Sequence, residues 1–265
     1  MNEGGSVVPG HRVLATFPFH DERGKLEKLV PKLVPGLVDT WLPIDDGSRD
    51  GGAELLRARG IEPITQPERR GIGAGLKAVV RHGRANGYDI LVVMAGNNKD
   101  DPAEIPRLLA PIVERGVDYV QGSRFLPGGS SPHLPPFRRV AIRLLSLVFR
   151  LYSGRGCTDL TNGFRAYRLS LFDDPRIDIE QDWLDDYEYE YYVHWKAYTL
   201  GYKVAEVPVT KTYPGVKGEE YSKIRPIAGW WRMLRPFVFL ALRIKKSERR
   251  WLPRTRPGPW CRSST

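Results

Sequence analysis

Residues 44–51 read Ile44-Asp45-Asp46-Gly47-Ser48-Arg49-Asp50-Gly51, so an apolar run ends in two adjacent carboxylates and then in turn residues. The run itself, residues 38–44, has the length and apolar character of a β-strand, although a proline interrupts it. Residues 51–59 have the pattern of a helix. The two aspartates therefore lie at the carboxyl end of a predicted strand, where open α/β sheets bind ligands. A surface turn is the alternative interpretation, because Asp-Gly-Ser is also favourable turn sequence.

The alternation of strand and helix patterns extends from residue 12 to about residue 122. The strand patterns cover residues 12–18, 38–44, 61–66, 89–94 and 118–121. The helix patterns cover residues 25–34, 51–59, 73–86 and 102–115. Four such units with short connections predict an α/β, Rossmann-like fold, in which helices cover both faces of a mostly parallel sheet. Beyond them the sequence predicts helices at residues 138–152, 186–200 and 225–244, and a strand at residues 202–209.

The positive charge of the chain is concentrated at one end. The 265 residues carry a net charge of +10, but Ser222–Thr265 alone carry +11, which leaves residues 1–221 at −1. We therefore expect a disordered N-terminus over residues 1–11, one α/β domain over residues 12–221, and a basic, amphipathic helical appendage over residues 222–265. The sequence has two cysteines, no secretory signal and no apolar run near the ~18 residues that span a bilayer, which indicates a reducing compartment and no membrane span.

Two segments combine basic and apolar residues. The appendage holds four of the seven tryptophans, Trp230, Trp231, Trp251 and Trp260. That combination favours the surface of an anionic membrane, and the alternatives are a solvated tail and an arm that binds nucleic acid. No nucleic-acid motif occurs elsewhere, so we expect no nucleic-acid partner. Residues 138–152 place four arginines among apolar residues, which is typical of either a core helix with a basic edge or an interfacial helix.

Several short motifs follow one another in an order that is more specific than any one of them. They are Thr16-Phe17-Pro18-Phe19-His20-Asp21-Glu22, Asp45-Asp46-Gly47-Ser48, Arg69-Arg70-Gly71-Ile72-Gly73-Ala74-Gly75, Gly122-Ser123-Arg124-Phe125, Asp159-Leu160-Thr161-Asn162-Gly163-Phe164-Arg165 and Ser222-Lys223. Over about residues 12–225 this order resembles the family-2 glycosyltransferases with the GT-A fold, and within them the dolichyl- or polyprenyl-phosphate sugar synthases. The resemblance implies an inverting enzyme that moves a sugar from a nucleoside-diphosphate sugar to a polyprenyl phosphate. It also implies a peripheral position on the cytoplasmic face of the cell membrane, and it leaves the sugar and any integral-membrane partner unidentified.

The resemblance also assigns roles to individual residues. Donor binding is expected from Pro18, Glu22, Asp45, Asp46, Gly73 and Asn97. The acceptor phosphate is expected to contact Arg124, Arg138, Arg139, Arg143, Ser222 and Lys223. Lys99, Arg124 and Asp159 are expected to carry catalysis. These residue types suit the chemistry, because a carboxylate accepts the ring N–H groups of a base, and the arginine fork holds phosphate oxygens in pairs. For Arg124, Arg139 and Arg143 the alternative is a solvated helix face.

One motif of that family is missing from this chain. The family ends its fourth strand in Met-Asp-Ala-Asp-Leu-Gln, whose two aspartates bind a divalent metal, whereas this chain has Met94-Ala95-Gly96-Asn97-Asn98-Lys99. Three explanations remain open. Asn97 with Asp100 or Asp101 could hold Mg²⁺ or Mn²⁺ in a shifted geometry; Lys99 could supply the positive charge without a metal; or the protein could be a non-catalytic relative that binds nucleotide sugars. We expect an active enzyme.

The acceptor side departs from the family as well. In the helix at residues 186–200 the acidic candidates are Glu188 and Glu190, and an arginine expected before the Ser-Lys pair is absent, which leaves Lys211, Lys217 and Lys223 as cations. An acceptor phosphate is already an anion and needs no general base. A hydroxyl acceptor on a saccharide or natural product would need one, and the candidates are Asp159, Asp185, Asp186 and Glu190.

Overall fold

The computed structural model of the chain describes residues 7–214, 235–240, 242 and 244. Its strands are β1 (Val13–Thr16), β2 (Pro18–Phe19), β3 (Thr40–Trp41), β4 (Ile44–Asp45), β5 (Ile64–Thr65), β6 (Ile90–Val93), β7 (Tyr119–Ser123), β8 (Arg165–Arg168) and β9 (Val204–Pro208). Its α-helices are α1 (Arg23–Leu29), α2 (Gly52–Arg57), α3 (Ile72–Ala85), α4 (Ile105–Arg115), α5 (Pro136–Ser153) and α6 (Glu188–Thr199). Short 3₁₀ helices cover Val30–Lys32, Pro102–Glu104, Leu169–Asp173 and Asp182–Leu184, and residues 235–240 are helical.

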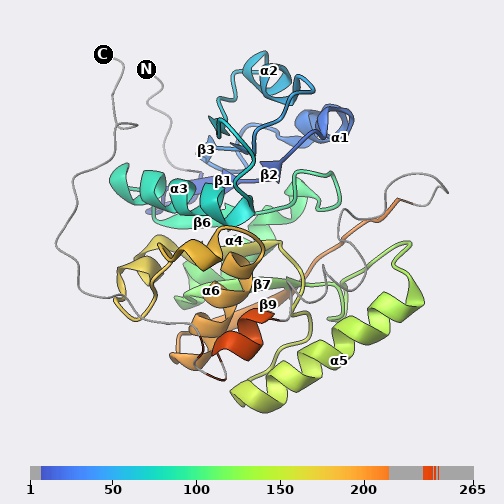
Figure 1. Cartoon of the computed structure of the whole chain (residues 1–265), viewed down its shortest axis with the longest axis vertical. Coiled ribbons are helices and arrows are strands. Elements are labelled where there is room, and N and C mark those ends of the chain that lie inside the picture. Colours follow the sequence, from blue (N-terminus) through green and yellow to red (C-terminus); the bar gives the residue numbers. More distant parts are fainter. Residues whose placement is uncertain (1–6, 215–234, 241, 243, 245–265) are drawn as a thin grey trace.

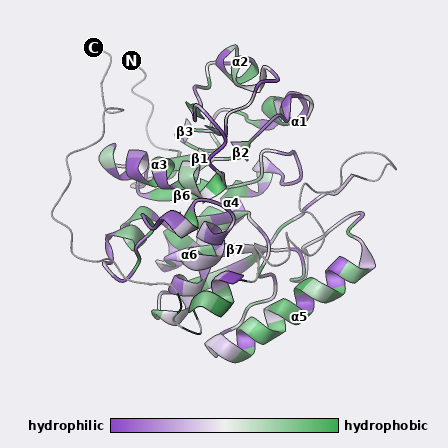
Figure 2. Cartoon of the chain, viewed as in Figure 1, coloured by the Kyte–Doolittle hydropathy of each residue, from purple (hydrophilic) through white to green (hydrophobic). Residues whose placement is uncertain are grey.

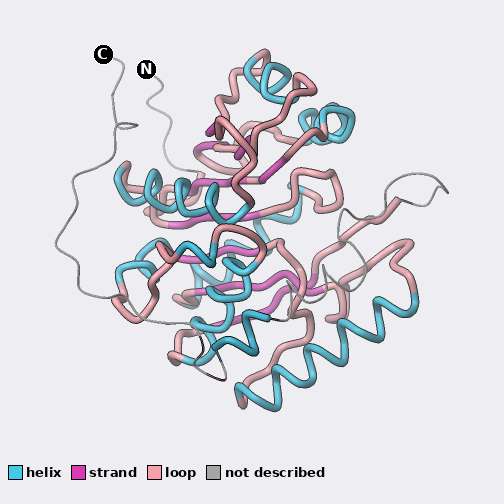
Figure 3. The backbone as a smooth tube through the Cα atoms, in the orientation of Figure 1, coloured by secondary structure: helices cyan, strands magenta, loops and turns pink. Residues whose placement is uncertain are grey.

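The described strands form a central sheet in the order β3-β1-β6-β8-β7-β9, which crosses the middle of the molecule (Figure 3). β1 pairs in parallel with β3 and β6, and β7 pairs in parallel with β9. β8 lies between β6 and β7 and runs antiparallel to both. The sheet is thus mostly parallel, as the sequence predicts, with one antiparallel strand at its centre that the sequence analysis does not predict.

β8 was missed because its sequence, Arg165-Ala166-Tyr167-Arg168, begins and ends with arginine and does not resemble a buried strand. Arg165 is nevertheless only 2% exposed. Its guanidinium donates hydrogen bonds to the backbone oxygens of Asn162, Leu160 and Glu190, which satisfy the buried charge with local carbonyl dipoles. A pattern of hydrophobic residues does not predict a buried arginine that is held by backbone carbonyl groups.

Side chains of the central strands alternate between two separate cores. On β1, Val13 and Ala15 belong to a core that includes residues of α1 and α4, and Leu14 belongs to a core that includes residues of α3 and α6. β6 repeats the alternation, with Ile90 and Val92 in the first core and Leu91 and Val93 in the second. Because successive strand residues point to opposite faces, helices must cover both sides of the sheet. This confirms the predicted α/β fold with helices on both faces (Figure 1).

The predicted strand at residues 38–44 is split at Pro43 into two short strands. β3 joins the central sheet, whereas β4 pairs with β2 and β5 in a small parallel sheet. Asp45 is the last residue of β4 and Asp46 follows it, so the two carboxylates lie at the carboxyl end of a strand, as predicted. A Cβ on Gly75 would lie 2.3 Å from Ile44 Cγ2, which shows that α3 packs directly against β4.

α5 is the least covered of the described helices, and it lies away from the sheet (Figure 1). Its buried residues are Ile142, Ser146 and Phe149. Six apolar side chains on the helix are 47–75% exposed: Phe137, Val140, Leu144, Leu147, Val148 and Leu151. Figure 2 shows hydrophobic and hydrophilic residues alternating along α5. The interpretation of this segment as a core helix with a basic edge is therefore wrong for most of its apolar side chains. Within the described residues, no helix combines the length and apolar character needed to cross a bilayer.

Much of each predicted terminal segment lies outside the described residues. Within the described part of the appendage, the Phe237 ring lies 5.6 Å from Phe149 of α5 and 5.4 Å from Tyr191 of α6. Arg235 forms an ion pair with Glu188 at the start of α6. At the other end, the Val7 backbone N–H donates to the Asp39 carboxylate at 3.0 Å. Residues 7–11 and 235–240 thus contact the α/β domain.

Candidate active site

The loops at the carboxyl ends of the central parallel strands bring several of the predicted donor residues to one edge of the sheet. Gly96 follows β6, and a Cβ at this position would lie 2.5 Å from the backbone oxygen of Pro18, so the loop after β6 lies against β2. Glu22 immediately precedes α1, and its carboxylate accepts a hydrogen bond from Lys25 Nζ at 2.7 Å. Open α/β sheets bind ligands at this edge.

Both predicted base-binding carboxylates are buried and hold turns in place. Asp46 Oδ1 accepts hydrogen bonds from the backbone N–H groups of Arg70 (2.8 Å) and Gly71 (3.0 Å) and from Gln66 Nε2 (3.1 Å). Asp45 Oδ1 accepts from the Ser48 N–H at 2.8 Å. Among the described residues, none donates a hydrogen bond to Asp45 Oδ2. Asp45 is therefore the better candidate for a base N–H, and Asp46 orders the glycine-rich turn.

The glycine-rich turn is shaped by close packing against the segment that precedes α6. A Cβ on Gly73 would lie 2.0 Å from the Leu184 oxygen and 2.7 Å from the Asp186 oxygen. Gly71 has a φ of 101°, a value that residues with a side chain rarely adopt, and a Cβ added to Gly71 would lie 2.4 Å from the Asp185 backbone oxygen. The structure thus gives Gly73 a packing role, and a contact of Gly73 with the donor stays a prediction.

Asp100, one of the candidate metal ligands, is engaged by other groups. Its Oδ2 accepts from the Ala95 N–H at 2.8 Å, and its Oδ1 forms an ion pair with Lys211 Nζ at 2.6 Å. Asp101 caps the following 3₁₀ helix by accepting from the Ala103 N–H at 3.1 Å. In the described part of the chain, no three His, Cys, Asp or Glu side chains are placed to share a metal ion.

The other residues of this loop are Asn97 and Lys99. Asn97 Oδ1 is buried and has no hydrogen-bond partner in the described part of the structure. Lys99 Nζ lies 5.4 Å from the centre of the Tyr213 ring. Burial, together with the charges of Lys211 and Lys25, lowers the pKa of Lys99 to about 8. Lys99 therefore lies in a cationic environment in the loop after β6.

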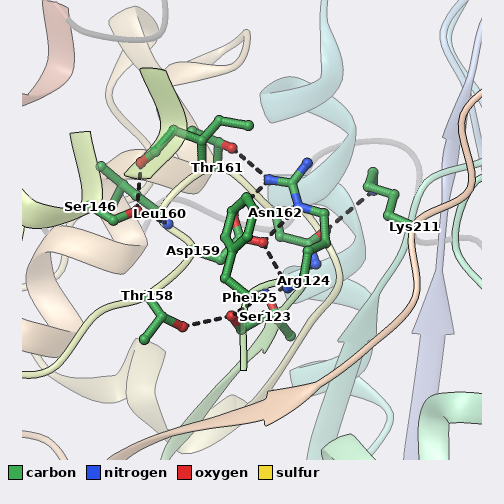
Figure 4. Close-up of polar contacts among 12 residues, drawn as sticks. Ser123, Arg124, Phe125, Ser146, Thr158, Asp159, Leu160, Thr161, Asn162 and Lys211 are labelled. Atoms are coloured by element: carbon green, nitrogen blue, oxygen red, sulfur yellow. Dashed lines mark hydrogen bonds and ion pairs between the residues drawn. The ribbon is translucent and has the colours of Figure 1, made fainter. Parts of the chain in front are cut away.

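Arg124 and Asp159 form a closed, buried ion pair (Figure 4). The guanidinium donates to the carboxylate from Nε (2.7 Å) and Nη2 (2.6 Å), and the Arg124 backbone N–H donates to it at 3.0 Å. The Arg124 side chain also donates to Tyr213 and, at 2.8 Å, to Thr161. Burial opposes the charge of Arg124, but the adjacent carboxylate outweighs it and raises the pKa of the guanidinium. This geometry favours positioning roles for Arg124 and Asp159, and their predicted direct roles in catalysis stay untested.

A pocket lies between the loop that follows β7 and the first turns of α5. It has a volume of about 470 Å³ and is lined by Arg124, Phe125, Leu126, Gly129, Ser130, Ser131, Pro132, Arg139 and Arg143. The Arg143 guanidinium lies 5.2 Å from the centre of the Phe125 ring. Three of the predicted acceptor residues, Arg124, Arg139 and Arg143, therefore share one pocket. Arg138 lies near enough to Lys99 for its charge to affect that lysine, and Ser222, Lys223 and Lys217 lie outside the described residues.

The acidic candidates of the acceptor side have different environments. Glu188 is buried and paired with Arg235, and Asp185 is paired with Lys77. Glu190 lies beside Gly163, whose Cβ would be 3.1 Å from Glu190 Oε1. Burial raises the pKa of Glu190, against the opposing charge of Arg165. Burial thus makes Glu190 easier to protonate than a solvent-exposed glutamate, as acid–base groups in active sites often are.

In the segment after β9, Lys211 is one of the candidate cations named from the sequence, but its partners and the part played by Tyr213 were not predicted. Lys211 reaches both Asp100 and, at 3.3 Å, Asn162 Oδ1, as Figure 4 shows in part. Tyr213 accepts a hydrogen bond from Arg124 and faces Lys99 with its ring. This segment therefore connects the predicted donor and acceptor sides. Its only sequence signal is a lysine and a tyrosine after a strand, which is too common to assign a role.

Comparisons with known proteins show the family to which the chain belongs. Residues 18–175 match the family described as Glycosyl transferase family 2. Polyprenol monophosphomannose synthase from Mycolicibacterium smegmatis is 31% identical over 214 residues, which are 78% of this chain and 80% of that protein. Undecaprenyl-phosphate mannosyltransferase from Micrococcus luteus is 31% identical over 205 residues, 75% of this chain and 83% of that protein.

Solved structures share the fold at lower identity. Glucosyl-3-phosphoglycerate synthase from Mycobacterium tuberculosis, in complex with Mn²⁺, uridine diphosphate and phosphoglyceric acid, superimposes with a TM-score of 0.63 at 19% identity, over 92% of this chain and 84% of that one. The chain therefore belongs to glycosyl transferase family 2 and is a glycosyltransferase of the hexosyltransferase class with a GT-A fold.

Proposed function

We propose that this enzyme transfers a hexose from a nucleoside-diphosphate sugar to the phosphate of a polyprenyl phosphate while it is bound to the cytoplasmic face of a membrane. The observation that carries the proposal is the arginine-lined pocket at the N-terminal end of α5, next to the exposed apolar residues of that helix. The pocket offers cationic groups for a phosphate. The helix offers apolar surface for a membrane and for the chain of a lipid acceptor.

α5 has the composition of a helix that lies in the headgroup region. Its exposed apolar residues at positions 137, 140, 144, 147, 148 and 151 recur at helical spacing, and its charged residues are four arginines without an acid. Apolar side chains enter the acyl boundary, and arginines contact anionic headgroups. This supports a peripheral position on an anionic membrane.

A phosphate acceptor fits the state of the carboxylates better than a hydroxyl acceptor does. Asp159 is closed by Arg124, Asp185 is paired with Lys77, and Glu188 is paired with Arg235. These carboxylates are poor general bases because each would have to leave an ion pair first. An acceptor phosphate needs no base. One oxygen of the acceptor phosphate attacks the anomeric carbon in line, and the bond between that carbon and the donor phosphate oxygen breaks. The nucleoside diphosphate leaves, and the configuration at the anomeric carbon is inverted.

The donor is proposed to lie between Asp45 and the loop after β6, with Pro18, Glu22 and Asn97 around it. The two relatives described above carry mannose in their names. A mannose-bearing nucleotide is therefore the first donor to test, followed by the other hexose nucleotides.

The proposal is tested by incubating the enzyme with radiolabelled nucleotide sugars and vesicles that contain polyprenyl phosphate, followed by extraction into organic solvent. We expect label in the organic phase with at least one donor. Label in water-soluble products alone would support a hydroxyl acceptor on a saccharide. The absence of turnover with every donor would contradict the proposal.

Glu190 supports the alternative of a hydroxyl acceptor, because burial raises the pKa of its carboxyl group. With a hydroxyl acceptor, the Glu190→Gln variant should lose about 10²–10⁴-fold in kcat, the usual contribution of a general base. With a phosphate acceptor, Glu190→Gln should change the KM for sugars while the rate keeps the pH profile of the wild type.

Membrane binding is tested on α5 itself. Leu151 is 75% exposed, and replacing it with glutamate should weaken sedimentation with anionic vesicles by about 2 kcal/mol, roughly thirty-fold, because one apolar anchor is lost. Val34, which is 48% exposed outside α5, is the matched control, and Val34→Glu should bind vesicles as the wild type does. Equal losses in the two variants would contradict a specific role of α5.

A further inference from the structure

The loop after β6 and the segment after β9 are joined beside the proposed donor site. Asp100 and Lys211 form an antiparallel β-bridge, and the Thr212 backbone N–H donates to the Lys99 oxygen at 2.9 Å. Two lysines from distant parts of the sequence, Lys99 and Lys211, thereby come to neighbouring backbone positions. Lys99 follows Asn97 by two residues, and Lys211 pairs with Asp100, whose carboxylate also accepts the Ala95 N–H. Ala95 and Asn97 are the positions at which the family resemblance places the metal-binding aspartates.

Lys211 pairs with Asp100, the acidic side chain that a shifted metal site would need most. Its Nζ pairs with Asp100 Oδ1 at 2.6 Å, and Asp100 Oδ2 accepts the Ala95 N–H at 2.8 Å. Asp100 is fully buried at 0% side-chain exposure, and Lys211 is 12% exposed. Binding of a divalent cation by Asp100 would therefore displace a buried ammonium group, which costs more than an exposed ion pair would.

The remaining groups do not fit a divalent cation either. Mg²⁺ needs a nearly octahedral set of oxygen ligands, and carboxylates supply most of the binding energy. Ala95 has no oxygen in its side chain, and Asn97 contributes one neutral oxygen, the buried Oδ1 without a hydrogen-bond partner in the described part of the chain. That single acceptor suits an O–H or N–H group of a ligand. Two ammonium groups nearby would repel a cation and attract an anion.

We infer that Lys99 neutralises the diphosphate of the donor in place of a divalent cation, and that the Lys211–Asp100 pair holds the loop so that Lys99 faces the diphosphate. The inference rests on the proposed function in that the donor carries a diphosphate. A lysine ammonium group contacts phosphate oxygens as a compact charge and strengthens its interaction as negative charge grows on the leaving group. Lys211 acts as a positioning residue through Asp100.

The test is binding of nucleotides to the full chain by titration calorimetry, without any sugar transfer. GDP, GMP, UDP and UMP are titrated in buffer with EDTA and in buffer with MnCl₂. We expect the diphosphate of the preferred base to bind with the same Kd in both buffers and more tightly than its monophosphate. Lys99→Ala should weaken diphosphate binding roughly 10- to 100-fold and abolish the preference for the diphosphate, and Lys99→Arg should retain both.

The matched control is Lys203→Ala, which removes an exposed lysine just before β9, at the opposite edge of the sheet, and should leave all four Kd values unchanged. Diphosphate binding that requires Mn²⁺ would overturn the inference and leave the proposed function standing. Diphosphate binding in EDTA that Lys99→Ala does not weaken would also overturn it. Absence of binding by all four nucleotides in both buffers would overturn both proposals, whereas metal-free binding without any sugar transfer would overturn only the proposed function.

Discussion

Replacing Asp159 with asparagine tests whether the Arg124–Asp159 pair is the closed, buried unit that the structure describes. The two side chains are 2% and 0% exposed, and the carboxylate accepts three hydrogen bonds from Arg124 at 2.6–3.0 Å. Asparagine keeps the size of the side chain but leaves the Arg124 guanidinium buried without a counter-charge. Breaking one partner of a buried ion pair costs about 3–5 kcal/mol.

The free energy of unfolding can be measured by urea denaturation, followed by tryptophan fluorescence. With a denaturant slope of about 3 kcal/mol per molar, the loss corresponds to a midpoint roughly 1–1.7 M lower in urea. The matched control is Asp173→Asn, which removes the same charge from an ion pair with Arg84 whose side chains are 60% and 41% exposed. That control should cost less than about 1 kcal/mol. If Asp159→Asn were as mild as the control, the pair would not be a closed buried unit, and its carboxylate would be available for catalysis.

Two further predictions concern the donor side. Gly73→Ala should destabilise the protein by about 1–3 kcal/mol, because the new Cβ would lie 2.0 Å from the Leu184 backbone oxygen. The control is Gly24→Ala on α1, where a Cβ would have no other atom within 4 Å; this variant should be neutral or stabilising in the same urea experiment. The kcat/KM for the donor should fall as the pH rises through about 8, because the pKa of Lys99 is lowered to about 8 and the neutral amine no longer attracts the diphosphate. Lys99→Arg should shift that decline to higher pH, and a decline at the same pH in this variant would assign it to another group.

The fold was largely predictable because its signal is local. The strand and helix patterns up to β7 have the right order, and Asp45 lies at a strand end as expected. β8 was not predictable, because the buried charge of Arg165 is satisfied by backbone oxygens that come from α6 and from the loop before β8. A sequence pattern records which residues are polar, but it does not record which carbonyl groups will be nearby.

The residue types of the candidate site were predictable from the sequence, but the hydrogen-bond and ion-pair partners of these residues were less so. The sequence pointed to Asp46, Arg124 and Asp159, but it did not show that Asp46 would order the glycine-rich turn or that Asp159 would be closed by Arg124. The Lys211–Asp100 pair joins residues 111 positions apart, and such a contact has no trace in local sequence. Long-range pairing is therefore what the structure adds to the family resemblance.

The most direct measurement compares acceptors that differ only in the phosphate. With the donor that the enzyme prefers, transfer is measured into vesicles that contain polyprenyl phosphate, into vesicles that contain the corresponding polyprenol, and into inorganic phosphate in solution. We predict a labelled lipid product with polyprenyl phosphate alone, because the arginine-lined pocket beside α5 supplies both the charge and the membrane contact. Transfer to the polyprenol, or to water-soluble acceptors at a comparable rate, would contradict the proposed function.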